Sequence, residues 1–315
     1  MPAATVETSQ RLRDFDTSEL CTLRPPVIKR TLCAHSLKVG ALAWASDSRH
    51  LVSIDQGGTV ILWNAVDARV RQYIARPLII SVALAPSSSL DSQKMIVALG
   101  GLDNAISICD MSPSLEKAEV LMMLPDIGDG HDGMVSALGF VDESTLISGG
   151  GDCDLRMWNV QHKATTQVLR GHTQGINSIG MAENAAQVAS CSIDGTVRLW
   201  DLRANENTHV FHCGTEASSA CFFPSNLALA AGCNDGTMRI FDTRTSGALA
   251  TMSDTSITAP CTGIQVRNVN GALMPCLVRY SLAPHTFHSR PHSSATLGAL
   301  STRPMETKAV SPCGT

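Results

Sequence analysis

The sequence predicts an all-β fold built from repeated antiparallel modules, a β-propeller, and two observations predict it. The first is a repeat, because several segments align without gaps and each ends in Asn or Asp. The strong copies are LVSIDQGGTVILWN (51–64), LISGGGDCDLRMWN (146–159) and VASCSIDGTVRLWD (188–201), and the weaker ones are VALGGLDNAISICD (97–110) and LAAGCNDGTMRIFD (229–242). The second is the spacing, since the closing residues lie 46, 49, 42 and 41 positions apart. This period is typical of a four-stranded propeller blade.

Each copy is predicted to be a β-hairpin. An apolar strand leads into a turn with Asp-Gly or Asp-Asn, and alternating residues such as Thr196 to Trp200 form the second strand. A further strand is expected upstream, on the inner side of each blade. These inner strands are predicted at Gly40 to Trp44, Val135 to Phe140, Ile176 to Met181 and Ala220 to Phe223.

The composition favours a globular intracellular protein over a membrane-spanning, secreted or nucleic-acid-binding one. Hydrophobic residues make up 44% and charged residues 17%, which is enough apolar material for a sizeable core. No apolar run approaches the roughly 20 residues of a membrane-spanning helix, and the first 20 residues include Glu7 and Asp14 rather than a secretion signal. The 11 cysteines form no C-x-x-C pair and are expected to be reduced in an intracellular protein. Only 4% of residues are aromatic and the body is acidic, so nucleic acid is not an expected partner.

These repeats resemble the WD-repeat family. The resemblance implies a hydrogen-bonded chain inside a blade, formed by a His, a Ser or Thr, a turn Asp and the Trp of the W-D pair, because such buried polar groups must satisfy one another. Two blades fit this pattern throughout, with His131, Ser148, Asp152 and Trp158 in one and His172, Ser190, Asp194 and Trp200 in the next.

The other blades depart from the network. The first keeps His35, Ser53 and Trp63, but Gly57 stands at the Asp position, so the network is expected to be broken there. The second keeps only Asp103, and the fifth keeps Asp235. Two networks in five blades predict modest intrinsic stability.

An enzyme or metal site is the competing interpretation of these polar residues. Each well-placed His and Asp already has a structural role in a predicted blade. A Ser-His-Asp or Cys-His catalytic arrangement could be assigned only by disrupting one of these blades. His285, His288 and His292 have a loosely metal-like spacing, but Pro291 interrupts it, so chance composition is the preferred interpretation. We therefore expect no catalytic residues, no cofactor and no metal.

Within the WD-repeat family, residues 30 to 265 are similar to the beta subunit of heterotrimeric G proteins. The segments that carry this similarity are RTLCAHSLKVGALAWASDSRHLVS (30–53), VALGGLDNAISI (97–108) and CFFPSNLALAAGCNDGTMRIFDTR (221–244). The resemblance implies a non-enzymatic signalling adaptor that presents one propeller face to a G-alpha subunit or an effector. The alternative is a generic WD-repeat scaffold for another complex.

The resemblance also implies which residues of this chain would contact a G-alpha subunit, because they stand at the family's contact positions. Lys38, Leu102 and Asn104 match the family's alpha-contacting residues, and Glu216 replaces an Asp. The departures include Gly40 and Met134 in place of Tyr, Leu78 in place of Trp, Ile80 in place of Met, Gly175 in place of Asp, Asn177 in place of Met and Asn234 in place of Asp. Interfaces draw much of their energy from aromatic anchors, so weakened alpha binding is expected.

The chain divides into three predicted regions. Residues 1–26 form a short segment with one marginal helical stretch at 9–21, which implies weak or lost binding of a gamma subunit. Residues 27–265 form the propeller, and residues 266–315, rich in Pro and Ser, are expected to be a disordered tail. The resemblance also implies a cytoplasmic protein that partners can hold at the inner face of the plasma membrane.

The number of repeats has a structural consequence. The family closes seven blades, whereas this sequence supplies five and a fragment. We expect an open arc or a strained smaller ring, with an exposed apolar face on both the first and the fifth blade.

Overall fold

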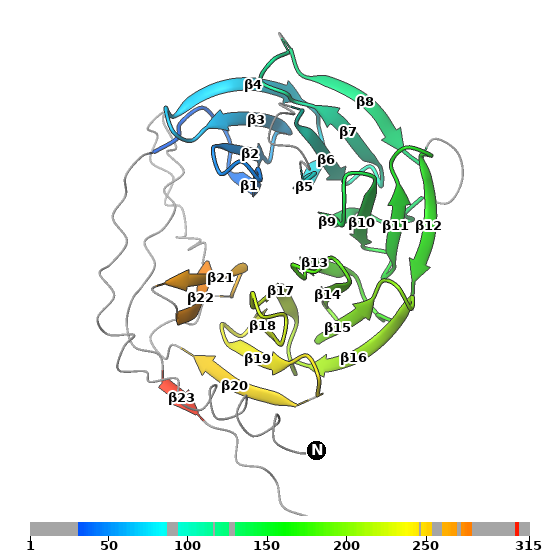
Figure 1. Ribbon diagram of the computed structural model, residues 1–315, viewed down its shortest axis with the longest axis vertical. Coiled ribbons are helices and arrows are strands. Elements are labelled where there is room, and N and C mark those ends of the chain that lie inside the picture. The colour runs from blue at the N-terminus through cyan, green and yellow to red at the C-terminus, as the bar shows by residue number, and fades with distance from the viewer. Residues whose placement is uncertain are drawn as a thin grey trace, which may run out of the picture.

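The computed structural model describes residues 31–86, 94–115, 117–125, 130–245, 247–253, 260–269, 272–278 and 306–308. These residues form strands and turns (Figure 1). Within those ranges, no helix has the length and apolarity needed to span a membrane.

Five antiparallel sheets follow one another along the chain, and each contains four consecutive strands that correspond to one predicted blade. Blade 1 contains β1 (Val39–Trp44), β2 (His50–Asp55), β3 (Thr59–Asn64) and β4 (Arg69–Ala75). Blade 2 contains β5 (Ile79–Leu84), β6 (Ile96–Gly101), β7 (Ile106–Asp110) and β8 (Glu119–Leu124). Blade 3 contains β9 (Val135–Phe140), β10 (Thr145–Gly150), β11 (Leu155–Asn159) and β12 (Ala164–Leu169).

Two more blades and a fragment complete the described chain. Blade 4 contains β13 (Ile176–Met181), β14 (Gln187–Ser192), β15 (Thr196–Asp201) and β16 (Glu206–His212). Blade 5 contains β17 (Ala217–Phe222), β18 (Ala228–Cys233), β19 (Met238–Asp242) and β20 (Ala248–Ser253). The hairpin of β21 (Gly263–Val269) and β22 (Ala272–Val278) follows, and β23 (Glu306–Lys308) pairs with β20.

Each blade carries an irregularity at the same place in its third strand. The pairing with the fourth strand shifts next to Trp63 in blade 1, Trp158 in blade 3 and Trp200 in blade 4, and next to the corresponding Cys109 in blade 2 and Phe241 in blade 5. A β-bulge increases local twist, which brings the outer strand around the blade. The tryptophan of each strong repeat is therefore placed at a bend, facing inward.

The core is divided among the interfaces between successive blades. Blades 1 and 2 share a cluster that includes Val52, Leu62 and Leu99, and blades 4 and 5 share one that includes Phe211 and Phe241. The inner strands β1, β5, β9, β13 and β17 lie around the centre of the molecule (Figure 1). Each blade thus depends on its neighbours to bury its two faces.

The described blades form an open arc, as the repeat count predicts (Figure 1). The expectation of two exposed faces is wrong for blade 5, because β21 packs against β17 and Cys261 and Ile264 join its core. It holds in part for blade 1: Leu42 and Trp44 are 39% and 52% exposed, whereas Leu51, Ile61 and Trp63 are buried, with Leu32 packed against them.

The β21–β22 hairpin spans residue 265, where the propeller is predicted to end. Its consecutive pairs run from Gly263 with Val278 to Val269 with Ala272. Residues 1–30 and most of 279–315 lie outside the described residues, and the predicted helical stretch, the rest of the tail and its three histidines fall there.

Candidate functional site

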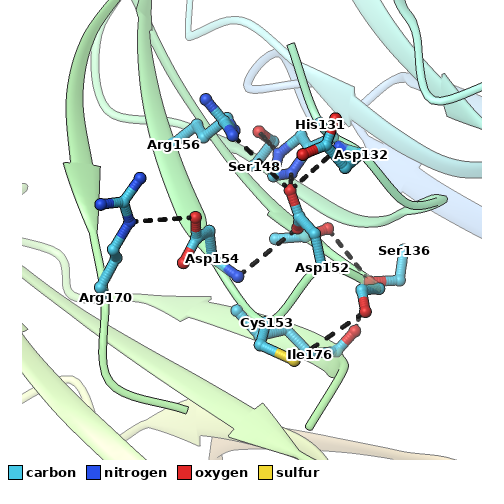
Figure 2. A network of polar contacts seen from close by, with 12 residues as sticks. His131, Asp132, Ser136, Ser148, Asp152, Cys153, Asp154, Arg156, Arg170 and Ile176 are labelled. Carbon is cyan, nitrogen blue, oxygen red and sulfur yellow. Dashed lines mark hydrogen bonds and ion pairs between the residues drawn. The ribbon is translucent and has the colours of Figure 1, made fainter. Parts of the chain in front are cut away.

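Blades 3 and 4 each contain the polar chain expected from the sequence. In blade 3, the indole Nε1 of Trp158 donates to Ser148 Oγ at 2.7 Å, and Ser148 Oγ lies 2.6 Å from His131 Nε2. His131 Nδ1 lies 2.9 Å from Asp152 Oδ1 (Figure 2). One arrangement satisfies every group: the serine hydroxyl donates to His131 Nε2, and the protonated Nδ1 donates to the carboxylate.

The chain in blade 4 has the same geometry. Trp200 Nε1 donates to Ser190 Oγ at 2.8 Å, and Ser190 Oγ lies 2.7 Å from His172 Nε2. His172 Nδ1 lies 2.9 Å from Asp194 Oδ2, and Thr196 adds a hydroxyl and a backbone N–H to that carboxylate. Ser190 and Trp200 are buried, so these bonds hold the turn of the blade against its interior.

Blade 1 also has a complete network, and the expectation that Gly57 breaks it is wrong. Trp63 Nε1 donates to Ser53 Oγ at 2.8 Å, and Ser53 Oγ lies 2.6 Å from His35 Nε2. The carboxylate comes from Asp55, whose Oδ2 lies 3.0 Å from His35 Nδ1. Asp55 stands two positions before Gly57, and its Oδ1 accepts the backbone N–H of Gly57 at 2.9 Å. Its carboxylate therefore lies beside the histidine, as in blades 3 and 4, although it comes from an earlier position in the repeat.

The environment keeps these carboxylates ionised. Burial by itself raises the pKa of Asp194, but the hydrogen bonds from Thr196, His172 and two backbone amides outweigh it and lower that pKa to about 2. The pKa values of Asp152 and Asp55 are also lowered, because hydrogen bonds that include one from a histidine outweigh the burial of each. Burial lowers the pKa of His172, although Asp194 counteracts this. The pair is therefore a neutral imidazole beside a carboxylate at neutral pH.

The described residues of blades 2 and 5 do not form such a chain. Asp103 and Asp235 mainly cap their own turns: the Ala105 amide donates to Asp103 at 3.4 Å and the Thr237 amide to Asp235 at 2.9 Å. In blade 5, Phe241 replaces the tryptophan and stacks on Phe211 with ring centroids 4.8 Å apart. Apolar packing thus takes the place of the polar chain at that interface.

A second repeated bond defines one face of the molecule. In every blade, the backbone N–H of a residue between the second and third strands donates to the carbonyl of a residue just before the inner strand. The donor and acceptor pairs are Gln56 and Lys38, Leu102 and Leu78, Gly151 and Met134, Ile193 and Gly175, and Asn234 and Glu216. These loops form a common surface at the starting ends of the inner strands, which we call the entry face.

All four residues expected to bind a partner lie on the entry face. The side chain of Lys38 is exposed, and Leu102 is 50% exposed. Asn104 is half-buried in a left-handed conformation with φ of 62°. Glu216 lies in blade 5, so the four residues are spread over three blades rather than gathered at one point.

The structure adds a bridge around Glu216 that the sequence did not reveal. Asn177 Nδ2 donates to Glu216 Oε1 at 3.0 Å, and Asn234 Nδ2 donates to Oε2 at 3.2 Å. Asn177 comes from blade 4 and the other two residues from blade 5, so the carboxylate is held across a blade interface. The signal in the sequence was that Asn177 and Asn234 both depart from the family.

The entry face also carries apolar side chains that sequence reasoning did not assign to a partner. Leu37, Leu78, Met134 and Ile193 are all exposed large hydrophobic residues, and they come from four different blades. Exposed apolar side chains around a polar rim are typical of a protein-interaction surface. Among the described residues, no group of three or more His, Cys, Asp or Glu side chains is arranged to hold a metal ion.

The family model "WD domain, G-beta repeat" matches residues 27–64, 124–159, 163–201 and 205–242, which include the first three strands of blades 1, 3, 4 and 5. The chain is a WD-repeat protein. It is similar to "Guanine nucleotide-binding protein subunit beta" of Zea mays, with 33% identity over 236 residues that cover 71% of this chain and 60% of the relative. The proteins of the same name from Arabidopsis thaliana and Solanum tuberosum are 33% and 32% identical, each over 70% of this chain and 60% of the relative. This WD-repeat chain thus spans about three fifths of the length of these curated relatives.

Proposed function

We propose that this protein is a non-enzymatic adaptor of the G-protein beta type. Its entry face presents Lys38, Leu102, Asn104 and Glu216 to a G-alpha subunit or to an effector that competes for the same surface. The observation that carries the proposal is the repeated backbone bond, which aligns equivalent loops from five blades on one face. Loops held by a rigid scaffold are well suited to binding, because little conformational entropy is lost on docking.

The expected alpha-subunit interface is weaker than that of a typical relative. Gly40 and Gly175 contribute no side chain, and Leu78 is an exposed aliphatic residue at the position where the family has an aromatic anchor. Loss of an aromatic anchor costs on the order of 2 kcal/mol of binding free energy. Binding of a gamma subunit would involve residues 1–26, which lie outside the described part of the chain.

The second candidate is a WD-repeat scaffold for an unrelated complex. The substituted aromatic positions and the Asn177–Glu216–Asn234 bridge favour it, because both change the chemistry of the entry face. Such a partner would meet aliphatic side chains and a fixed carboxylate. No chemical step is assigned to the protein under either candidate.

Co-purification with alpha and gamma subunits tests the first candidate. We expect Lys38→Glu to abolish association with the alpha subunit, because it reverses an exposed charge on the entry face. Lys117→Glu is the matched control, since Lys117 is also exposed but lies between β7 and β8. Equal binding by the two variants would remove the first candidate. Capture of an unrelated complex that Lys38→Glu does not disturb would favour the second.

A further inference from the structure

A cavity of about 310 Å³ lies at the opposite ends of the inner strands from the entry face. Its wall draws on four blades, because it includes Trp44 from blade 1, Leu84 and Pro86 from blade 2, Phe140 from blade 3, and Met181 and Glu183 from blade 4. We call this side the exit face. Inner strands of six residues separate the two faces by about 20 Å.

The wall contains large apolar side chains because the inner strands of blades 1 to 4 each end in a large hydrophobic residue. Trp44, Leu84, Phe140 and Met181 are the last residues of β1, β5, β9 and β13. Phe140 is 9% exposed, since it packs against blade 2, whereas Trp44 is 52% exposed because no described blade precedes blade 1. Trp63, Trp158 and Trp200 are buried, which leaves Trp44 as the single exposed tryptophan of the four in the chain.

Glu183 gives the cavity its charge. Among the described residues it is the only charged residue in the wall. Its side chain is exposed, and its backbone N–H donates to Asn226 Oδ1 at 3.1 Å, which fixes its loop against blade 5. Its carboxylate forms no ion pair with any residue in the described part of the chain. Asp47 and Asp142 follow the wall residues Ser46 and Val141 directly.

Both neighbouring aspartates add negative charge at neutral pH. Burial raises the pKa of Asp47, but hydrogen bonds from His50 and two backbone amides outweigh it and lower that pKa. Bonds from Ser144 and Thr145 lower the pKa of Asp142 in the same way, against its burial. In the described loops that join the first and second strands of blades 1 to 4, next to the cavity, Asp47, Asp142, Glu143 and Glu183 outnumber the two bases, Arg49 and Lys94.

We propose that this exit-face cavity binds a segment of a partner protein that places an aliphatic or aromatic side chain next to a Lys or Arg. The apolar side chain contacts Trp44, Leu84 and Met181, and the cation pairs with the carboxylate of Glu183. Charge complementarity selects this occupant, because an acidic segment would meet an unpaired carboxylate beside an apolar wall. The site is separate from the entry face, so the protein can hold two partners at once.

Fluorescence of Trp44 tests the proposal directly in the full chain. The probe is the peptide acetyl-Lys-Leu-Phe-Arg-amide, and acetyl-Glu-Leu-Phe-Glu-amide is its acidic counterpart. The basic peptide should shift the emission to shorter wavelength and protect Trp44 from acrylamide, because the indole leaves water. We expect the acidic peptide to bind at least tenfold more weakly. Added salt should lower the affinity of the basic peptide.

Matched variants separate this site from the rest of the surface. Glu183→Gln should lower the affinity of the basic peptide severalfold. Two control variants should leave that affinity unchanged: Glu206→Gln, at the exposed start of β16, and Lys38→Glu, on the entry face. Equal binding of the two peptides, or an unchanged affinity in Glu183→Gln, would overturn the proposal. So would a free protein in which acrylamide does not reach Trp44 and neither peptide alters emission, because another part of this chain or a second copy would then fill the cavity.

Discussion

Blade 1 and blade 3 hold a carboxylate in the same place with different residues. Blade 3 has Gly150 followed two positions later by Asp152, and blade 1 has Asp55 followed two positions later by Gly57. In both, the carboxylate lies within 3.0 Å of Nδ1 of the histidine and accepts a backbone N–H of the turn, from Asp154 in blade 3 and from Gly57 in blade 1. The network therefore requires a carboxylate at one point in space, and residues at two different backbone positions can supply it.

The two blades differ in how tightly the glycine is enclosed. A Cβ atom at Gly150 would lie 2.5 Å from His131 Nδ1 and still closer to Asp152 Oδ1, where there is no room for it. A Cβ atom at Gly57 would lie 2.9 Å from Leu37 Cδ1 and 3.3 Å from Asp55 Oδ1, and Leu37 is an exposed side chain that can move. Blade 4 has Ser192 at the position of Gly150, and its hydroxyl turns away to the carbonyls of Gln174 and Gly175.

Replacing the glycine by Asp in each blade should give the largest difference in stability between the two blades. Gly150→Asp should lower the free energy of unfolding by about 3 to 5 kcal/mol, because it forces a second carboxylate into a closed, already charged site. Gly57→Asp should cost about 1 kcal/mol or less, since the added carboxylate can reach solvent after Leu37 moves. Denaturant unfolding of the two variants measures the difference. Equal losses would show that the two sites are enclosed to the same degree.

Removal of the shared hydroxyl should have the next largest effect. Ser190→Ala leaves Trp200 Nε1 and His172 Nε2 without their partner in a buried site, so we expect a loss of about 2 to 4 kcal/mol in the free energy of unfolding. Ser107→Ala in blade 2 is the control. Ser107 is also buried, but its hydroxyl has no hydrogen-bond partner in the described structure, so its removal should change stability by less than about 0.5 kcal/mol. A large loss in Ser107→Ala would mean that blade 2 has a polar network after all.

The dependence of stability on pH should be the smallest of the three effects. The folded-state pKa of His172 is below its ordinary value, so the unfolded chain binds a proton first and stability falls as pH drops below about 6.5. The pKa of Asp194 is also lowered, to about 2, so its contribution is present above about pH 4 and is lost as pH falls toward 2.

Unfolding curves between pH 7.5 and 5 would measure the histidine contribution. His172→Gln should flatten the slope in this window, whereas His212→Gln, at the exposed end of β16, should not. A slope that His172→Gln leaves unchanged would assign the pH dependence to other groups.

Much of the fold could be predicted from the sequence because the blades are local. The repeats at 146–159 and 188–201 each contain two strands and the turn that joins them, so the pattern of apolar residues, Asp-Gly turns and terminal Trp is readable within a short window. The serine, aspartate and tryptophan of a blade also lie close in sequence. For the polar networks, position-by-position matching was wrong in blade 1, where Asp55 supplies the carboxylate that was expected at position 57.

The surfaces could not be predicted in the same way, because they combine residues from different blades. The carboxylate of Glu216 is held by Asn177, which lies 39 positions earlier. The cavity on the exit face joins the ends of four strands, from Trp44 to Met181. No local pattern encodes such distances, since they depend on how successive sheets are rotated around the centre.

By itself, the sequence determined that this chain forms consecutive antiparallel blades with internal polar networks, because hydrogen bonding and alternation act over tens of residues. The tertiary structure was needed to show that Asp55 completes the first network, that β21 packs against the fifth blade, and that Trp44 remains exposed. The physical reason is that burial of a blade face depends on the neighbour packed against it, and that neighbour lies elsewhere in the chain.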